Sequence, residues 1–201
     1  MKVLITSGGT SVMIDDIRCI TNLSRGRLGR DIAEVFIERG DRLYEEVCLL
    51  RSKDAFPVKY PIRPYRDEVY FTFDEYMFKV EQLCKKMNPD IIILSAAVSD
   101  YGVDKTDGKI SSKDSLTLNL KPLPKVISKV RGWCPDAVIC GFKLLSGATR
   151  EELIDKARES IVKNNLDLVV ANDWSTIKSQ YHDIIFVTKD NFSVFNSARA
   201  E

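Results

Sequence analysis

Residues 5–29, ITSGGTSVMIDDIRCITNLSRGRLG, join the first predicted strand of this chain to its first predicted helix. Roughly 20 polar, glycine-punctuated residues lie between the apolar run that ends at Ile5 and the helical pattern that begins near Arg27. Loops at this place in α/β folds usually take ~2–6 residues. A glycine-rich turn that only holds a pyrophosphate also needs just a handful of positions. A connection of this length at this place predicts an active site.

The rest of the chain alternates between strand and helix patterns. Apolar runs rich in Val and Ile lie at residues 2–6, 47–50, 90–94, 138–141, 166–171 and 183–187. Their apolarity is continuous, which is typical of strands covered on both faces. Helical patterns lie at residues 28–39, closed by Gly40, and at 73–87, 124–133 and 149–164. We therefore expect one α/β domain over residues 1–201, a doubly wound, Rossmann-like, mainly parallel sheet with helices on both faces.

Two stretches break this alternation. Residues 51–68 hold three prolines and predict an irregular surface crossover that leads to a short strand near residues 69–72. Residues 102–114, GVDKTDGKISSKD, are polar and predict a flexible loop after the strand at 90–94.

Composition and charge exclude several classes of protein. The 201 residues are 44% hydrophobic, which is enough for one buried core. Thirty basic and 29 acidic residues give a formal charge of +1, so no global field favours nucleic acid and we expect none as a partner. The N-terminal apolar run is too short for a signal peptide, and no run approaches the ~18 apolar residues of a membrane helix. We expect no membrane partner.

The cysteines indicate the compartment. The chain has five of them, widely spaced and without a Cys-x-x-Cys pair. This pattern predicts reduced thiols in a cytoplasmic protein. With a single histidine, His182, and no thiol pair, we expect no metal held by histidine or cysteine. Binding of a magnesium ion together with nucleotide phosphates is an open alternative.

Ligands of an open α/β sheet bind beyond the carboxyl ends of its strands. After the first strand, Gly8 and Gly9 allow the backbone to approach a phosphate, and residues 24–29 offer free amides at a helix N-terminus. An ordinary turn and helix cap are the alternative. The same window holds four arginines that favour an anion, Arg18, Arg25, Arg27 and Arg30. A solvated basic face is the alternative for Arg27 and Arg30.

Two later strands are also followed by unusual segments. Ala96 and Ala97 place small side chains where a flat ligand could lie, with Asp100 close by, although close packing and a cap would suit the same residues. Phe142 directly follows the run 138–141 and could stack on a base or belong to the core. Lys109, on the loop GKISSK, suits closure over phosphates, with a solvated loop as the alternative.

In chain order, the segments ITSGGT, IDDIRCITNLSRGRLG, SAAVSDY, KISSK, GFKLL and KARESIVKNNLDLVVAND resemble the phosphopantothenoylcysteine synthetase family, also called phosphopantothenate-cysteine ligase. The resemblance runs from residue 1 to about residue 187 and keeps the motif order. The GFKLL form is similar to the stand-alone bacterial ligases. The chain ends at Glu201 without the amphipathic last helix that the resemblance leads us to expect.

The resemblance implies an activity in coenzyme A synthesis. The carboxylate of 4'-phosphopantothenate attacks the α-phosphorus of a nucleoside triphosphate, CTP or alternatively ATP, and pyrophosphate leaves. The amine of L-cysteine then displaces the nucleoside monophosphate and forms an amide. Mg²⁺ would bridge the phosphates. The resemblance also implies a homodimer that helps to complete the site.

The resemblance also assigns roles to residues of this chain. The catalytic residues are Asn22, Arg18 and Lys109. The substrate-binding residues are Arg18, Asn22, Ser24 and Gly26. The nucleotide-binding residues are Gly8, Gly9, Thr10, Ser95, Ala96, Ala97, Asp100, Lys109, Gly141, Phe142 and Lys163. The chain departs from the family pattern at Leu23 and Arg25, where many members have histidine and serine, and near Glu159, where they have a further lysine.

Two other functions fit a sheet of this class. A nicotinamide-dependent oxidoreductase could use Arg51, after the second strand, to contact a 2'-phosphate, but no Gly-x-Gly-x-x-Gly follows the first strand. A nucleotide-binding module without catalysis would be consistent with the departures at Leu23 and Arg25. Fold alone excludes neither of them.

Overall fold

A large, mostly parallel sheet forms the centre of the computed structural model, which describes residues 1–39, 43–62, 65–113, 115–176 and 181–198. Its strands lie in the order β12-β11-β10-β9-β6-β1-β4-β5. The parallel strands are β1 (Lys2–Ser7), β4 (Glu46–Ser52), β5 (Tyr65–Tyr70), β6 (Ile91–Leu94), β9 (Val138–Leu145) and β10 (Leu168–Asp173). The antiparallel strands β11 (Tyr181–Val187) and β12 (Phe192–Ala198) complete one edge.

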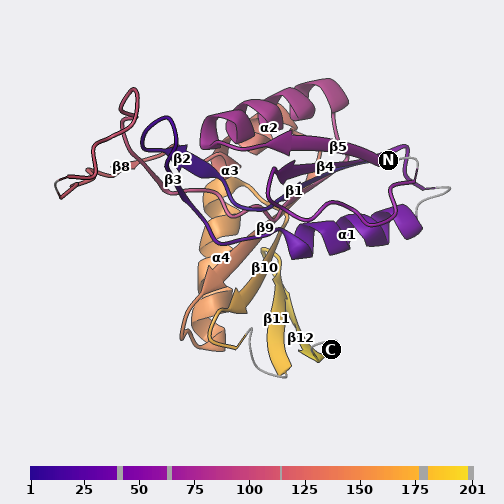
Figure 1. The fold of residues 1–201 in the computed structure, drawn as a ribbon. Helices are drawn as coiled ribbons and strands as arrows, with labels where there is room; N and C mark the ends of the chain where they lie inside the picture. Colours follow the sequence, from indigo (N-terminus) through magenta and orange to yellow (C-terminus); the bar gives the residue numbers. More distant parts are fainter. Residues whose placement is uncertain (40–42, 63–64, 114, 177–180, 199–201) are drawn as a thin grey trace.

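Helices cover both faces of this sheet, as the alternating pattern predicts (Figure 1). The helix α1 (Arg27–Glu38) buries Ala33 and Ile37 against one face. The other face is covered by α2 (Phe73–Met87), α3 (Ile127–Trp133) and α4 (Arg150–Asn164). Strands β1, β4 and β6 are apolar on both faces because both core clusters draw side chains from them. The Rossmann-like, mainly parallel α/β fold is therefore confirmed.

The sheet has its switch point between β1 and β6. From β1 the chain builds outward through β4 and β5, and it then returns to the other side of β1 through β6, β9 and β10. The connections that leave β1 and β6 therefore run to opposite faces and open a crevice beyond the carboxyl ends of these strands. Residues 8–26 and 95–100, which the sequence singles out, follow these two strands.

The long connection after β1 is ordered by a small sheet of its own. Strands β2 (Ser11–Met13) and β3 (Cys19–Thr21) pair as an antiparallel hairpin, and β7 (Tyr101–Gly102) pairs with β8 (Lys121–Pro122). In Figure 1 the β2–β3 hairpin and the segment that ends in β8 project together from one end of the sheet. We call the described residues of 11–21 and 101–122 the arm. The sequence patterns did not indicate either pair of strands.

Several predicted boundaries are corrected. The strand β9 continues from Val138 to Leu145, so Phe142 lies inside it and does not follow its end. The strand β5 begins at Tyr65, inside the stretch expected to be irregular, because its charged side chains are tolerated on an edge strand. The helix α2 is capped by Thr72 with Glu75 in a capping box, and β12 was not predicted. Gly40 and Asp114 lie outside the described residues.

The five cysteines are free thiols. Four of them are buried, and Cys19 is half-buried on β3. Burial raises the pKa of the Cys48 and Cys140 thiols to about 12, so these two side chains behave as apolar core groups. Within the described chain, no helix combines the length and the apolarity needed to cross a membrane.

A buried carboxylate fixes the turn between β9 and α4. Asp173, at the end of β10, accepts hydrogen bonds from the Ser175 hydroxyl and backbone and from the backbone N–H groups of Gly147 and Ala148. The Ser175 hydroxyl contributes most to lowering the Asp173 pKa, from 3.8 to about 2, against the opposing effect of burial. Only an ionised carboxylate can accept all these bonds.

We predict that Asp173→Asn lowers the melting temperature by several degrees at pH 7. A depressed folded-state pKa contributes stability that is complete above the unfolded pKa of 3.8 and is lost as pH falls toward about 2. The variant should therefore lose less stability than the parent protein between these pH values. Thermal unfolding from pH 2 to 7 measures this, with the exposed Asp136→Asn as the control. Equal acid dependence in parent and variant would contradict the assignment.

Candidate active site

The peptide group of Ala97 joins the segments that leave β1 and β6. Its N–H donates to the Gly8 carbonyl at 2.8 Å, and its carbonyl accepts from the Thr10 N–H at 3.2 Å. The same carbonyl accepts a hydrogen bond from Nδ2 of Asn22 at 2.7 Å. Three of the predicted site residues, Gly8, Thr10 and Asn22, therefore converge on a fourth, Ala97.

Glycines are required where these segments touch. Gly8 adopts a left-handed backbone with φ +85°, and a Cβ there would lie 2.2 Å from the Ser52 hydroxyl. A Cβ on Gly9 would lie 2.6 Å from the Asn22 carbonyl oxygen. The buried Tyr70 hydroxyl donates to the Ser7 carbonyl at 2.8 Å, and burial raises the pKa of Tyr70, so it stays a neutral donor. The turn after β1 is thus held by a hydrogen bond from Tyr70 of β5.

The N-terminus of α1 opens into this region. Its N-cap is Gly26, with φ 69°, and none of the described side chains caps it or places an acidic group in its first turn. The helices α2 and α4, by contrast, each have a capping box and two acidic residues in the first turn. An uncapped helix start leaves backbone N–H groups and the positive end of the helix dipole for an anion. Ser24 and Gly26 lie at this end, as predicted.

A cavity of about 390 Å³ adjoins the Ala97 junction on the side of α3 and α4. The residues that line it include the predicted Ala96, Asp100, Phe142 and Lys163. Its charged lining consists of two carboxylates and four lysines. Asp100 pairs with Lys125, and Glu159 pairs with Lys156 at 2.8 Å, so Lys143 and Lys163 leave the lining net positive.

Two predicted nucleotide-binding residues pack against neighbouring elements, since Ser95 is half-buried and Gly141 is buried. The Ser95 hydroxyl donates to the Thr6 carbonyl at 2.6 Å and lies close to Gly29 of α1, where a Cβ would come within 2.8 Å of it. Gly141 is buried in β9, where a Cβ would lie 3.0 Å from Leu166. Both residues are small and allow a neighbouring helix or strand to pack closely against them.

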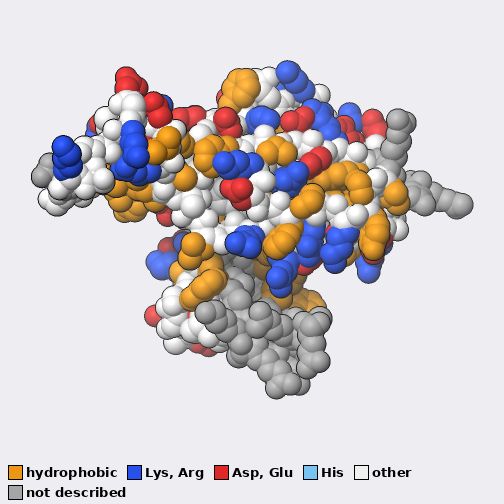
Figure 2. All heavy atoms as spheres, viewed as in Figure 1, with side chains coloured by type: hydrophobic (Ala, Val, Ile, Leu, Met, Phe, Trp, Pro, Cys, Tyr) orange, Lys and Arg blue, Asp and Glu red, His pale blue; other side chains and the backbone are white. Residues whose placement is uncertain are grey.

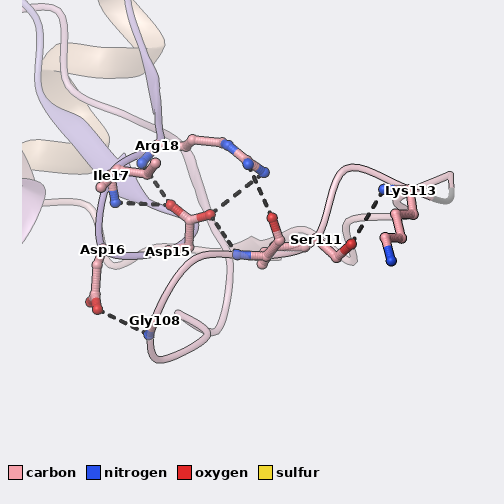
Figure 3. A network of polar contacts seen from close by, with 8 residues as sticks. Asp15, Asp16, Ile17, Arg18, Gly108, Ser111 and Lys113 are labelled. Carbon is pink, nitrogen blue, oxygen red and sulfur yellow. Dashed lines mark hydrogen bonds and ion pairs between the residues drawn. The ribbon is translucent and has the colours of Figure 1, made fainter.

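The remaining two predicted residues, Arg18 and Lys109, lie on the arm. Figure 3 shows Arg18 beside Asp15. Arg18 lies at the tip of the β2–β3 hairpin, where its guanidinium donates to the Ile110 carbonyl at 3.0 Å and lies 3.6 Å from the Asp15 carboxylate. Lys109 is exposed on the neighbouring loop. The structure therefore brings Arg18 and the Lys109 loop together, whereas Asn22, which follows β3, has a different partner, the Ala97 carbonyl.

Sequence reasoning missed several residues of the site. Ser99 is one of them, because its N–H donates to the hydroxyl of the predicted Thr10 at 2.8 Å and so joins the two parts of the crevice. Lys125, Lys143 and Lys156 line the cavity. No local pattern marks these lysines, since α3, β9 and α4 meet only in the folded chain. Asp15 was also missed, although an aspartate two residues before a turn amide is a recognisable signal.

The described residues contain no cluster of three His, Cys, Asp or Glu side chains that could hold a metal ion. An ion that accompanies a nucleotide would depend on phosphate oxygens for most of its ligands.

Fold and site together define a Rossmann-like α/β domain with a candidate anion and nucleotide site at the switch point of its sheet. The family described as DNA/pantothenate metabolism flavoprotein C-terminal domain matches residues 1–199, and the chain belongs to this family. The resemblance in the sequence motifs is thereby confirmed.

The chain is similar to named relatives. It is 40% identical over 190 residues to the coenzyme A biosynthesis bifunctional protein CoaBC of Thermococcus kodakarensis, which covers 94% of this chain and 45% of that protein. It is 29% identical over 245 residues to the phosphopantothenate-cysteine ligase of Mus musculus, covering 94% of this chain and 76% of the relative. The chain spans about half the length of the bifunctional relatives that it matches.

A solved structure is similar over almost all of the chain. The DNA/pantothenate metabolism flavoprotein from Streptococcus pneumoniae has a TM-score of 0.88 and 34% sequence identity, covering 98% of this chain and 93% of that one. The strand order and the long connection after β1 therefore belong to a fold already seen by experiment.

We predict that Gly9→Ala destabilises the protein by about 1–3 kcal/mol, the usual cost of overpacking, because the new Cβ would press on Asn22. Gly132→Ala is the matched control, since a Cβ on this helical glycine meets nothing within 4 Å. The control should gain about 0.5–1 kcal/mol from reduced backbone entropy. Urea unfolding measures both changes. Equal effects of the two substitutions would contradict the close approach at Gly9.

Proposed function

We propose that this chain catalyses the ligation of 4'-phosphopantothenate and L-cysteine through an acyl-nucleotide. The relatives support this proposal, since one is named phosphopantothenate-cysteine ligase and another a bifunctional protein of coenzyme A biosynthesis. Free thiols at all five cysteines are consistent with a cytoplasmic enzyme. The single observation that carries the proposal is the position of Asn22 at the junction of the crevice.

Asn22 is exposed, and its side chain is held by one hydrogen bond to the Ala97 carbonyl. A side-chain amide has a second N–H, which Asn22 can offer to a ligand. An amide does not titrate, so it donates at any working pH. A donor fixed in this way suits the oxygen of an acyl group, which gains negative charge when it is attacked.

The two neighbouring regions suit the two ends of a nucleoside triphosphate. The N-terminus of α1 offers backbone donors to phosphates. The cavity between α3 and α4 offers the Phe142 ring and the net positive pair Lys143 and Lys163. We propose that Gly8, Gly9 and Thr10 approach the phosphates, while Ala96, Ala97 and Asp100 line the nucleotide.

We propose a reaction of two steps for this arrangement. The phosphopantothenate carboxylate attacks the α-phosphorus, the bond to the bridging oxygen breaks, and pyrophosphate leaves. The cysteine amine then attacks the acyl carbon, loses a proton, and expels the nucleoside monophosphate. Asn22 donates to the acyl oxygen in the second step, and the cations Lys109 and Arg18 balance charge on the oxygens. We propose CTP as the triphosphate, with ATP as the alternative, and Mg²⁺ bound through the phosphates.

The separation of Arg18 from Asn22 supports a homodimer. Four residues of extended chain span about 13 Å. The Arg18 guanidinium contacts the Ile110 carbonyl and Asp15, whereas Nδ2 of Asn22 donates to the Ala97 carbonyl. We propose that the arm of a second copy brings its Arg18 to this crevice. The exposed apolar side chains Ile17, Ile20 and Leu23, on or next to the hairpin, are consistent with such a contact.

The oxidoreductase alternative is less well supported. Arg51, which it would need for a 2'-phosphate, makes two-pronged hydrogen bonds to Asp67 and donates to the Ala55 carbonyl at 3.2 Å. Its side chain is only 15% exposed. Because its donors are already occupied by Asp67 and Ala55, Arg51 stabilises the β4–β5 edge of the sheet.

The direct test of the function is pyrophosphate release with each substrate omitted in turn. We expect release only when phosphopantothenate and a triphosphate are present together, and amide formation only when cysteine is added. Reduction of a nicotinamide dinucleotide would favour the oxidoreductase instead. Binding of nucleotide without any release would favour a module that lacks catalysis.

We predict that Asn22→Asp lowers amide formation by about 10²–10³-fold, since one donor to a developing oxyanion is worth ~3 kcal/mol. Nucleotide binding should stay largely intact because the phosphate contacts lie on other residues. Gln82→Glu, on α2, makes the same amide-to-carboxylate change far from the crevice in sequence and is the control. Single-turnover assays measure both steps, and unchanged turnover of Asn22→Asp would refute this role.

We predict that CTP with Mg²⁺ raises the melting temperature most within a panel of CTP, ATP, UTP and GTP. A ligand at ~100 times its dissociation constant adds ~2.7 kcal/mol to the stability of the folded state. Thermal shift measures the ranking. A larger shift with ATP would move the assignment to ATP, and no shift with any nucleotide would contradict a nucleotide site.

A further inference from the structure

The turn of the β2–β3 hairpin is built around the carboxylate of Asp15. This side chain is completely buried. Its Oδ1 accepts hydrogen bonds from the N–H groups of Ile17 at 2.9 Å and Arg18 at 2.7 Å. One oxygen of Asp15 thus fixes the backbone on which Arg18 is mounted.

The second oxygen of Asp15 holds a different segment. Its Oδ2 accepts from the N–H of Ile110 at 3.1 Å and lies 3.6 Å from the Arg18 guanidinium. Arg18 in turn donates to the Ile110 carbonyl at 3.0 Å. Both backbone groups of Ile110 are therefore held by the hairpin turn. Figure 3 shows Asp15, Asp16 and Arg18 of this turn facing the segment that contains Gly108 and Ser111.

Asp16 adds a second connection between the same two segments. Its backbone N–H donates to the Gly108 carbonyl at 3.1 Å, and its Oδ2 accepts from the Gly108 N–H at 2.9 Å. Its Oδ1 lies 2.6 Å from the Lys105 ammonium. Lys109 is therefore the exposed residue between two anchored neighbours, Gly108 and Ile110.

We propose that Asp15 is a positioning residue that locks the Lys109 loop to the Arg18 turn, so that the two cations are presented to the substrates as one unit. This inference rests on the proposed function for the roles of the two cations. The lock itself rests on the contacts of the arm alone. It also changes the expectation for residues 102–114, because part of this loop is anchored to the hairpin.

The lock requires a carboxylate and not merely a polar side chain. Burial raises the pKa of Asp15, but the N–H bonds from Ile17, Ile110 and Arg18 and the Arg18 charge outweigh it, so the net pKa lies below its usual value. An asparagine that keeps its oxygen on the hairpin N–H groups would turn its own NH₂ toward the Ile110 N–H and the Arg18 guanidinium. Asp15→Asn should therefore release the loop while keeping the hairpin turn.

Hydrogen exchange on the intact chain tests the lock without any ligand. We expect the Ile110 amide to exchange roughly 10-fold faster or more in Asp15→Asn, the loss expected for one hydrogen bond to a charged group. Asp104→Asn is the matched control, because it breaks the exposed Asp104–Lys121 ion pair of the arm without touching the hairpin. Unchanged exchange at Ile110 in Asp15→Asn would overturn the proposal.

Kinetics then test whether Asp15 acts through Lys109. We expect Asp15→Asn to lower kcat/KM by about 10- to 100-fold in the parent background, as for a misplaced catalytic group. In a Lys109→Ala background the same substitution should cost less than about 3-fold, because the group that it positions is already gone. An equal cost in both backgrounds would show that Asp15 does not act through Lys109 and would overturn the proposal.

These outcomes separate failure of the lock from failure of the function. If the parent protein releases no pyrophosphate with phosphopantothenate, triphosphate and cysteine, the proposed ligase activity fails and exchange at Ile110 alone decides the lock. If Asp15→Asn does not fold, Asp16→Ala replaces it, since this exposed residue loses the Gly108 and Lys105 contacts at less risk to the fold. Faster exchange at Gly108 then supports the lock, and unchanged exchange overturns it.

Discussion

The candidate site depends on one constraint, the contact between the chain leaving β1 and the chain leaving β6 at the peptide of Ala97. Gly8, Thr10 and Asn22 all bond to this peptide. Because a Cβ at Gly8 or Gly9 would clash with its neighbours, two residues without side chains are needed to bring the segments this close. The helix start at α1 and the cavity beside α3 and α4 adjoin this contact, so its geometry sets how a phosphate and a base could be bound at one switch point.

The arm brings charged side chains to the region around the Ala97 contact. Over the face seen in Figure 2, basic and acidic side chains are interspersed, in agreement with a net charge of only +1. The basic side chains that matter for the proposed reaction are therefore positioned locally. Asp15 and Asp16 orient the turn of Arg18 and the loop of Lys109, while Asp100 and Glu159 pair with two of the four cavity lysines. Acidic residues thus position the two cations of the arm and pair with two of the cavity lysines, which leaves Lys143 and Lys163 for an anionic ligand.

The sheet class and the helices α1, α2, α3 and α4 could be predicted from the sequence, because they depend on local periodicity. The place of the site, inferred from the unusual length of one loop, stays a prediction. Other elements could not be predicted, because they depend on contacts that form only in the folded chain. The edge strand β5 reads as a loop, since YRDEVY carries charges that only an edge position tolerates. The β2–β3 hairpin was missed because its short strands are set by pairing and by the buried Asp15, not by apolar pattern. The order of motifs along the chain does not give distances in the folded protein. It therefore could not predict whether Arg18 and Asn22 of one subunit act in the same site.

The central claim is that, in the crevice at Ala97, the phosphopantothenate carboxylate is joined to the α-phosphorus of a nucleoside triphosphate before cysteine reacts. The most direct measurement uses phosphopantothenate labelled with ¹⁸O in its carboxylate, followed by mass spectrometry of the products. The proposed reaction transfers one labelled oxygen to the nucleoside monophosphate and none to pyrophosphate, because the amine breaks the acyl carbon–oxygen bond. Label in inorganic phosphate or in the pyrophosphate, or no label in the monophosphate, would contradict it.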